Sequence, residues 1–108
     1  MALSKNQVIR MTQGFLDRLR KEHDVREAYL FGSFAKNTAK EYSDVDLAIV
    51  LGSLDALEES PFDESFKIFH EAQEYNSLLE VVCFLQEEFE QNGGALVRLI
   101  KKEGIRLL

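Results

Sequence analysis

The sequence predicts an α/β protein (α+β in terms of layers), with helices packed on a small mixed β-sheet in the order α-β-α-β-α-β-α. Two observations favour this class. Several segments repeat apolar residues at helical spacing, and short apolar runs that suit buried strands lie between those segments. The chain has 108 residues, a length that ordinary domain sizes assign to one unit with a modest core. We therefore expect residues 1–108 to form a single domain.

The first helix is predicted over residues 5–22. Ser4 and Gln7 fit a capping box, in which an N-cap hydroxyl and a side chain three residues later each bond the backbone of the other. Basic residues occupy the outer faces of this helix, where they fit a solvated surface better than a nucleic-acid contact. The apolar positions at helical spacing are Val8, Met11, Phe15 and Leu19.

Two strands are predicted over residues 25–31 and 45–51, with a polar connection between them. Within that connection we expect a short helix over Ser33–Ala39, which starts at the Gly32-Ser33 turn. Asn37 is expected to close this helix, because asparagine tolerates left-handed backbone better than most residues do.

The second half of the chain is predicted to contain two helices around a third strand. The first of these helices covers residues 62–74, and its apolar stripe is Phe62, Phe66 and Phe69. The strand covers residues 78–85 and is apolar on both faces except at Glu80. Residues 86–91 can also be helical, and a last helix ends at Gly104 in left-handed geometry. The apolar stripe of that last helix is Leu96, Leu99 and Ile100.

The lengths of the connections predict how the strands pair. The connection between strands 25–31 and 45–51 is short for a parallel crossover, so we expect these strands to be antiparallel. A full helix separates strand 45–51 from strand 78–85, so these two can run parallel. Glu80 would then lie at the same end of the sheet as Asp44 and Asp46.

Composition disfavours several classes of protein. A formal net charge of −6 would repel a polyanion such as DNA, so general nucleic-acid binding is disfavoured. Cys83 is the only cysteine and its neighbours are apolar, so we interpret it as a core residue. No apolar run approaches the length of a membrane span, and the first residues lack the apolar stretch of a secretory signal. We therefore expect no membrane association and a cytoplasmic location.

The acidic residues around the second strand favour a cation site. Asp44 and Asp46 are two residues apart on a strand, so both carboxylates project from the same face. Like charges placed side by side are costly unless a cation or protons compensate, and a neighbouring Glu80 raises that cost. Such a group suits Mg²⁺, which prefers a few carboxylates together with phosphate and water oxygens. Two such ions about 3.5–4 Å apart can clamp the attacking and leaving oxygens of a nucleotidyl transfer.

The Gly32-Ser33 turn favours a phosphate site beside those acids. Glycine lets the backbone approach a ligand closely, and amides at the start of a helix attract phosphate. Lys36 and Lys40 lie just beyond the turn and can meet phosphate oxygens as point charges. Each feature alone also fits an ordinary turn, a solvated loop, a surface lysine or, for Glu80, a sheet edge facing water. Their combination favours the site.

These residues resemble the signature of the DNA polymerase beta-like nucleotidyltransferase superfamily. Gly32-Ser33, the ten-residue interval and Asp44-Val45-Asp46-Leu47 are similar to its motif, and the order of elements resembles its minimal nucleotidyltransferase (MNT) branch. The resemblance covers nearly the whole chain and implies a nucleotidyltransferase fold. Two positions depart from the pattern. The family usually has aspartate where this chain has Glu80, and often has glycine where this chain has Asn37.

The resemblance implies that the chain transfers a nucleoside monophosphate, AMP from ATP, to an acceptor hydroxyl while pyrophosphate leaves. Asp44 and Asp46 would hold Mg²⁺, as two ions when the nucleotide is bound. Glu80 would be the third metal ligand and would take the acceptor proton. Gly32, Ser33 and Lys36 would bind the phosphates of the nucleotide.

The resemblance also implies a partner protein. Minimal nucleotidyltransferases are often the antitoxins of HEPN-type ribonuclease toxins, and some adenylylate the toxin. The wall that completes the acceptor pocket would come from such a partner or, in a homodimer, from a second copy. The acidic residues between 55 and 90 would meet a basic partner surface or remain a solvated face. Two alternatives stay open: a non-catalytic antitoxin-type binding module that neutralises a partner by occlusion, and a nucleotide or metal sensor.

Overall fold

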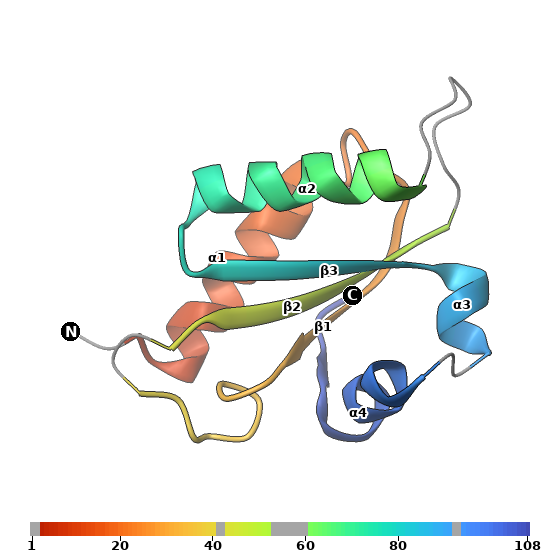
Figure 1. The fold of residues 1–108 in the computed structure, drawn as a ribbon. Helices are drawn as coiled ribbons and strands as arrows, with labels where there is room; N and C mark the ends of the chain where they lie inside the picture. Colours follow the sequence, from red (N-terminus) through yellow and green to blue (C-terminus); the bar gives the residue numbers. More distant parts are fainter. Residues whose placement is uncertain (1–2, 41–42, 53–60, 92–93) are drawn as a thin grey trace.

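The described residues form one four-stranded sheet with helices on both of its faces (Figure 1). The computed structural model describes residues 3–40, 43–52, 61–91 and 94–108. The order across the sheet is β3-β2-β1-β4. In chain order the elements are α1 (Lys5–Leu19), β1 (Val25–Phe31), β2 (Val45–Leu51), α2 (Pro61–Tyr75), β3 (Leu79–Leu85), α3 (Gln86–Glu90), α4 (Ala95–Glu103) and β4 (Ile105–Arg106). This is the mixed α/β architecture that the sequence predicts, with one additional short strand.

The strands pair as their connections predict. β1 runs antiparallel to β2, and β2 runs parallel to β3. The additional strand β4 is antiparallel to β1 and follows α4 after a single residue. Val45 at the start of β2 pairs with Leu79 at the start of β3, so both strands begin at the same end of the sheet.

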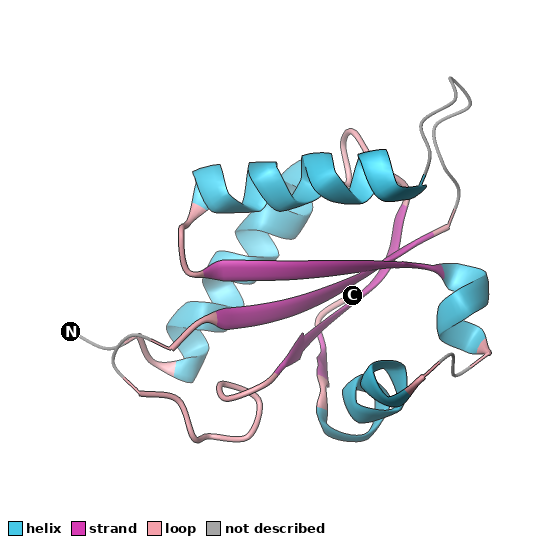
Figure 2. Cartoon of the chain, viewed as in Figure 1, coloured by secondary structure: helices cyan, strands magenta, loops and turns pink. Residues whose placement is uncertain are grey.

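Alternate residues of β2 face two different cores. Leu47 faces the larger core, which α1 and α2 cover with buried side chains such as Phe15 and Ile68. Ala48 faces a smaller core, which α3 and α4 cover with side chains such as Ile100. Figure 2 shows α1 and α2 on one side of the strands and α4 on the other. The even-numbered residues of β2 therefore look toward α3 and α4.

The start of α1 confirms the predicted capping box. The Gln7 amide donates to Ser4 Oγ at 3.1 Å, and the Ser4 amide donates to the side-chain oxygen of Gln7 at 2.8 Å. The helix ends at Leu19, three residues before its predicted end, and residues 20–22 form turns.

The predicted short helix over Ser33–Ala39 is wrong. The chain after β1 forms turns, in which the Lys36 amide donates to the Gly32 carbonyl at 3.1 Å. A helix as short as Ser33–Ala39 fixes many residues for few hydrogen bonds, so it is unfavourable without further support. The left-handed backbone predicted at Asn37 is confirmed, with φ of 61°.

The predicted aromatic stripe of α2 is also wrong. The helix buries Ile68 against the sheet, whereas Phe66 is 56% exposed and Phe69 is 38% exposed. The side chain of Phe62 lies outside the described residues. Glu64 shares the buried side of α2 with Ile68 and bonds the turn that follows α1. Ala72, four residues after Ile68, completes this buried side, and the aromatic residues lie on the other side of the helix.

The end of α4 differs from its prediction in two respects. The helix buries Val97 and Ile100, and it leaves Leu96 and Leu99 exposed. Gly104 is not left-handed, because its φ is −70° and the backbone continues extended into β4. A Cβ at Gly104 would collide with the Ile100 carbonyl oxygen, so close packing is what requires glycine here.

The structure bears on two features that composition raised, the burial of Cys83 and the length of the apolar helices. Cys83 is partly buried against the larger core, and this burial raises the pKa of its thiol to about 11. None of the helices in the described part of the chain combines the length and the apolar character that a membrane crossing requires.

Candidate active site

Asp46 and Glu80 lie side by side on the α4 side of the sheet. Asp46 pairs with Glu80 across the parallel ladder and with Phe31 across the antiparallel ladder. Side chains of directly paired residues point to the same face of a sheet. The register therefore places both carboxylates next to the end of β1, where the Gly32-Ser33 turn begins.

Asp44 is less closely associated with this pair. It is exposed and lies just before the first residue of β2, so it is not on the strand where the sequence predicted it. Among the described residues, the group of possible metal ligands whose atoms all lie within 4.8 Å of one another is elsewhere, at Glu22, His23 and Glu71. The structure thus brings Asp46 to Glu80 and leaves the three predicted ligands wider apart than that spacing.

Gly32 is required by the position of Asp46. Its φ is +76°, a left-handed value that side chains disfavour. A Cβ at this position would also collide with Oδ2 of Asp46. The Asp46 carboxylate therefore lies directly against the backbone of the turn. Any residue with a Cβ at position 32 would force this carboxylate to move away.

Several backbone amides of the turn after Gly32 lack a backbone acceptor among the described residues. The hydrogen bonds inside the turn are donated by the amides of Lys36, Asn37 and Thr38. The earlier amides of residues 33–35 donate to no backbone carbonyl of a described residue. Successive amides of this kind are the donors from which anion-binding concavities are built, even without a regular helix.

Lys36 is engaged with α4 in this structure. Its Nζ lies 3.0 Å from Oε2 of Glu103, and both side chains are partly exposed. Sequence reasoning missed Glu103, because the two residues are far apart in the chain and only the fold brings them together. A phosphate would have to compete with this carboxylate for the lysine.

The electrostatics of the pair favour a bound cation. The pKa of Asp46 is raised from 3.8 to about 6, first by burial and then by the charges of Glu80 and Asp44 and by a hydrogen bond with Glu80. Asp46 thus holds a proton more tightly than an ordinary carboxylate does. A divalent cation relieves the same repulsion, so the arrangement can hold a metal ion next to a phosphate-binding turn.

An aromatic wall of Tyr29, Phe31 and Phe89 lies in the smaller core, on the same side of the sheet as Asp46, and escaped the sequence analysis. Tyr29 of β1 stacks on Phe89 of α3 with ring centroids 5.3 Å apart. Its hydroxyl donates to a carboxylate oxygen of Glu27 at 2.6 Å. Burial and this acceptor raise the pKa of Tyr29 to about 12. The alternation along β1, which puts Tyr29 and Phe31 on one face, is the signal that identifies this wall.

Comparison with protein-family models matches residues 15–108 to the family described as "Polymerase beta, Nucleotidyltransferase". The match runs from the middle of α1 to the last residue and includes the Gly32 turn, Asp46 and Glu80. The chain belongs to this family. It is a nucleotidyltransferase domain, and the family match agrees with the resemblance to minimal nucleotidyltransferases.

Solved structures with the same fold include a candidate nucleotidyltransferase from Sulfolobus solfataricus, at 13% identity and a TM-score of 0.58. The alignment covers 94% of this chain and 80% of that one. A toxin–antitoxin complex with AMP-PNP aligns at 16% identity and a TM-score of 0.59, over 89% of this chain and 72% of that one. A mutant of the toxin–antitoxin MntA-HpeT aligns at 17% identity and a TM-score of 0.55, over 98% of this chain and 73% of that one. At these identities the likeness concerns the fold. Among curated proteins, none matches this sequence.

Proposed function

We propose that this nucleotidyltransferase moves AMP from ATP to a hydroxyl group of a partner protein. In that reaction the acceptor oxygen attacks the α-phosphorus, the bond from this phosphorus to the oxygen bridging to the β-phosphorus breaks, and pyrophosphate leaves. The acceptor proton passes to the Asp46–Glu80 pair, with Glu80 as the general base. The observation that carries the proposal is the pairing of Asp46 with Glu80 directly beside Gly32.

The donor set fits Mg²⁺, held by Asp44, Asp46 and Glu80. All three are carboxylates, and the raised pKa of Asp46 marks a place where positive charge is favoured. When bound, as two ions with the nucleotide present, Mg²⁺ would neutralise phosphate charge and align the attacking and leaving oxygens. Asp44 is exposed, so its side chain has room to turn toward the other two carboxylates.

The turn after β1 would hold the phosphates of ATP. Gly32 lets this turn lie directly against the Asp46 carboxylate. The amides of residues 33–35 together with the Ser33 hydroxyl would donate to the phosphate oxygens. Lys36 would bind a phosphate oxygen after exchanging its ion pair with Glu103. These donors would fix the orientation of the leaving group without moving a proton.

The acceptor would belong to a toxin of the HEPN type, with this chain acting as its antitoxin in the cytoplasm. The fold relatives that form toxin–antitoxin complexes, one of them with AMP-PNP, support this setting.

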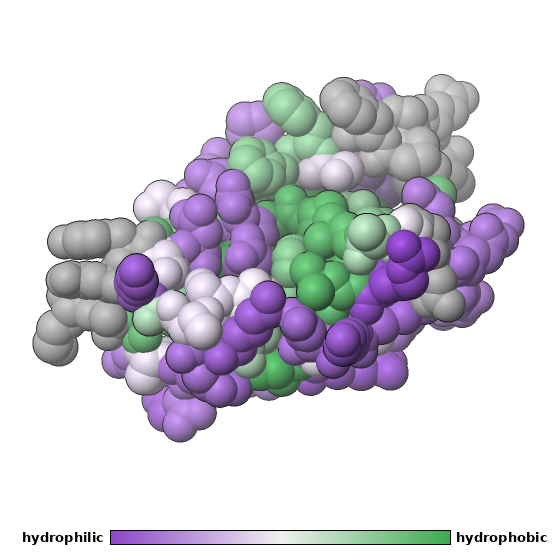
Figure 3. Space-filling view, turned by 60° about the horizontal axis from the view of Figure 1, so that its bottom comes forward, coloured by the Kyte–Doolittle hydropathy of each residue, from purple (hydrophilic) through white to green (hydrophobic). Residues whose placement is uncertain are grey.

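The surface of the chain offers places where a partner protein would bind. Hydrophobic residues gather in the middle of the face in Figure 3, and β3 is an edge strand of the described sheet. The exposed large hydrophobic side chains of the described residues are Phe66, Phe69, Leu96 and Leu99.

A second candidate is a non-catalytic antitoxin that blocks its partner by occlusion. Two observations favour it: the three carboxylates are not all within 4.8 Å of one another, and Lys36 is paired with Glu103. The two candidates differ in whether the carboxylates are needed. Occlusion predicts that Asp44→Asn and Asp46→Asn still inhibit the partner.

The deciding experiment incubates this protein with the protein encoded beside it, ATP labelled at the α-phosphate, and Mg²⁺. We expect the partner to gain label and the mass of AMP, and the gain to disappear with EDTA and in both asparagine variants. Asp17→Asn, which changes an exposed aspartate of α1, is the matched control and should transfer label like the wild type. Equal labelling by the wild type and by Asp46→Asn would contradict the proposed mechanism.

A further inference from the structure

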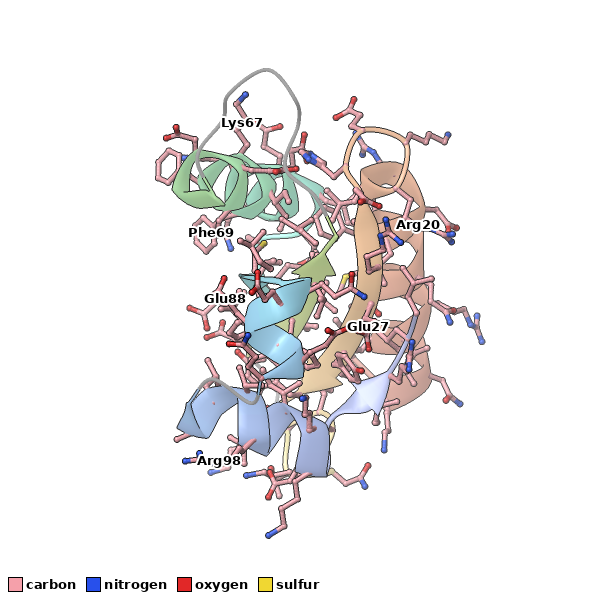
Figure 4. The ribbon with its side chains drawn as sticks, turned by 90° about the vertical axis from the view of Figure 1, so that its right-hand side faces the viewer. Arg20, Glu27, Lys67, Phe69, Glu88 and Arg98 are labelled. Carbon is pink, nitrogen blue, oxygen red and sulfur yellow. The ribbon has the colours of Figure 1, made fainter. Side chains whose placement is uncertain are left out.

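A buried histidine joins the end of α1 to α2, far from the chemistry proposed above. The turn that follows α1 lies beside α2 in both Figure 1 and Figure 4. His23 in this turn has a side chain that is only 10% exposed, and its Nδ1 lies 2.9 Å from Oε1 of Glu64. The Glu64 side chain is itself 3% exposed. Burying the charge of a carboxylate costs free energy, and here one ring nitrogen of His23 compensates for it. The surroundings of the other ring nitrogen then decide what this histidine can bind.

The second ring nitrogen of His23 is buried without a hydrogen bond among the described residues. Oε2 of Glu71 lies 3.4 Å from this Nε2. One ligand atom each of Glu22, His23 and Glu71 lies within 4.8 Å of the other two. Because Glu64 is a carboxylate, it favours the tautomer whose proton is on Nδ1. Nε2 then carries a lone pair and lies near Oε2 of Glu71.

This geometry is the one found around metal-binding histidines. Such a histidine donates one ring N–H to a carboxylate, which fixes its orientation, and it binds the metal through the other nitrogen. Glu64 has the position of the orienting carboxylate, and Glu22 and Glu71 supply two further oxygen ligands. A neighbouring cavity of about 360 Å³, lined in part by Glu22 and Glu71, gives solvent access and room for water ligands.

We propose that His23, Glu22 and Glu71 form a binding site for one divalent transition-metal cation of the Zn²⁺ class, with Glu64 orienting the histidine. One imidazole nitrogen and two carboxylates suit Zn²⁺, whereas Mg²⁺ prefers oxygen ligands throughout. The ion would tie the end of α1 to α2 on the larger-core side of the sheet, opposite Asp46. The role is therefore structural and independent of nucleotidyl transfer.

The competing explanation is an imidazolium ion. A protonated His23 would donate from Nδ1 to Glu64 and make an ion pair between Nε2 and Glu71, with no metal needed. The two explanations differ in the state of Nε2, which carries a lone pair in the metal site and a proton in the ion pair. They also differ in whether Zn²⁺ changes the protein.

The experiment uses the full chain with Asp44→Asn and Asp46→Asn, so that the candidate active site does not contribute to metal binding. Titration with Zn²⁺ followed by calorimetry should show one ion bound per chain, and the melting temperature should rise with Zn²⁺ and fall with EDTA. Nitrogen-15 NMR of the imidazole rings should show a proton on Nδ1 of His23 and a shift of Nε2 on adding Zn²⁺. A ring that carries both protons at neutral pH and does not change with Zn²⁺ would overturn the proposal.

Four substitutions in this background separate the roles. His23→Gln should weaken Zn²⁺ binding by more than 100-fold, and Glu64→Gln should weaken it by about 10–100-fold, as loss of an orienting partner does. His70→Gln removes the other histidine of the chain and should leave the affinity unchanged. Glu71→Gln, at a partly exposed position, repeats the test without disturbing a buried group. If His23→Gln and Glu71→Gln both bound Zn²⁺ as tightly as the background protein does, the proposal would also be overturned.

Discussion

Replacing Asp46 by asparagine should stabilise the metal-free protein at neutral pH. The substitution keeps the shape of the side chain, and its amide can still donate to Glu80. It removes the negative charge that Glu80 and Asp44 oppose. A residue proposed to bind metal is thus expected to weaken the fold when no metal is present.

The size of the effect follows from the pKa of Asp46, which is raised from 3.8 to about 6. Each pKa unit corresponds to about 1.4 kcal/mol, which gives about 3 kcal/mol for a fully buried group. The Asp46 side chain is partly exposed and solvent screens its charge, so we expect about half of this, about 1.5 kcal/mol. The folded state binds the proton more tightly than the unfolded state. The contribution of this proton to stability is therefore fully present below pH 3.8 and is lost as the pH rises through about 6.

Urea unfolding of the wild type and of Asp46→Asn, in EDTA at about pH 7.5 and again near pH 4, measures this difference. We expect the variant to be more stable by about 1.5 kcal/mol at the higher pH and nearly equal at the lower one. Asp17→Asn on the exposed face of α1 should show no such dependence. An Asp46→Asn variant that is no more stable than the wild type at pH 7.5 would refute the electrostatic reasoning.

Three further predictions concern single substitutions. Gly32→Ala should lower AMP transfer roughly 100-fold, because the new methyl group displaces the Asp46 carboxylate. The control is Gly94→Ala, which should retain the activity: Gly94 also has a positive φ, but a Cβ there would meet no atom within 4 Å. Tyr29→Phe should cost about 1 kcal/mol in urea unfolding by removing a side-chain hydrogen bond, and the wild type should show one tyrosine that ionises only near pH 12 in ultraviolet titration. Ile68→Ala should cost about 2–5 kcal/mol, whereas Phe66→Ser on the exposed side of the same helix should change stability by about 0.5 kcal/mol or less.

The sheet was predictable because local signals and connection lengths agree. The turn and the strands on both sides of it leave too few residues for a parallel crossover, so the antiparallel pairing of β1 with β2 follows from the sequence. The parallel pairing of β2 with β3 follows from the helix between them. Together they lead to the register that sets Asp46 beside Glu80. Whether these residues bind metal and nucleotide stays a prediction.

Long-range contacts explain what the sequence did not predict. The pattern of α2 favours burial of its phenylalanines, but the helix buries Ile68 together with Glu64, which contacts His23. These two residues are 41 positions apart, so no local pattern connects them. The pairing of Lys36 with Glu103 is hidden for the same reason. Short-range periodicity predicts where the helices lie in the chain, but it does not reveal contacts between distant residues such as these.

The alternation of β2 divides the molecule into two functional halves. Odd-numbered residues such as Leu47 pack on α1 and α2, where substitutions should act through stability and where the proposed zinc-type site lies. Even-numbered residues begin with Asp46 at the open end of the smaller core, where substitutions should act through the chemistry. A one-residue change of register in β2 would exchange the two sets, placing a carboxylate in the larger core. The strong apolar preference of the odd positions is therefore what keeps Asp46 beside Glu80 and against Gly32.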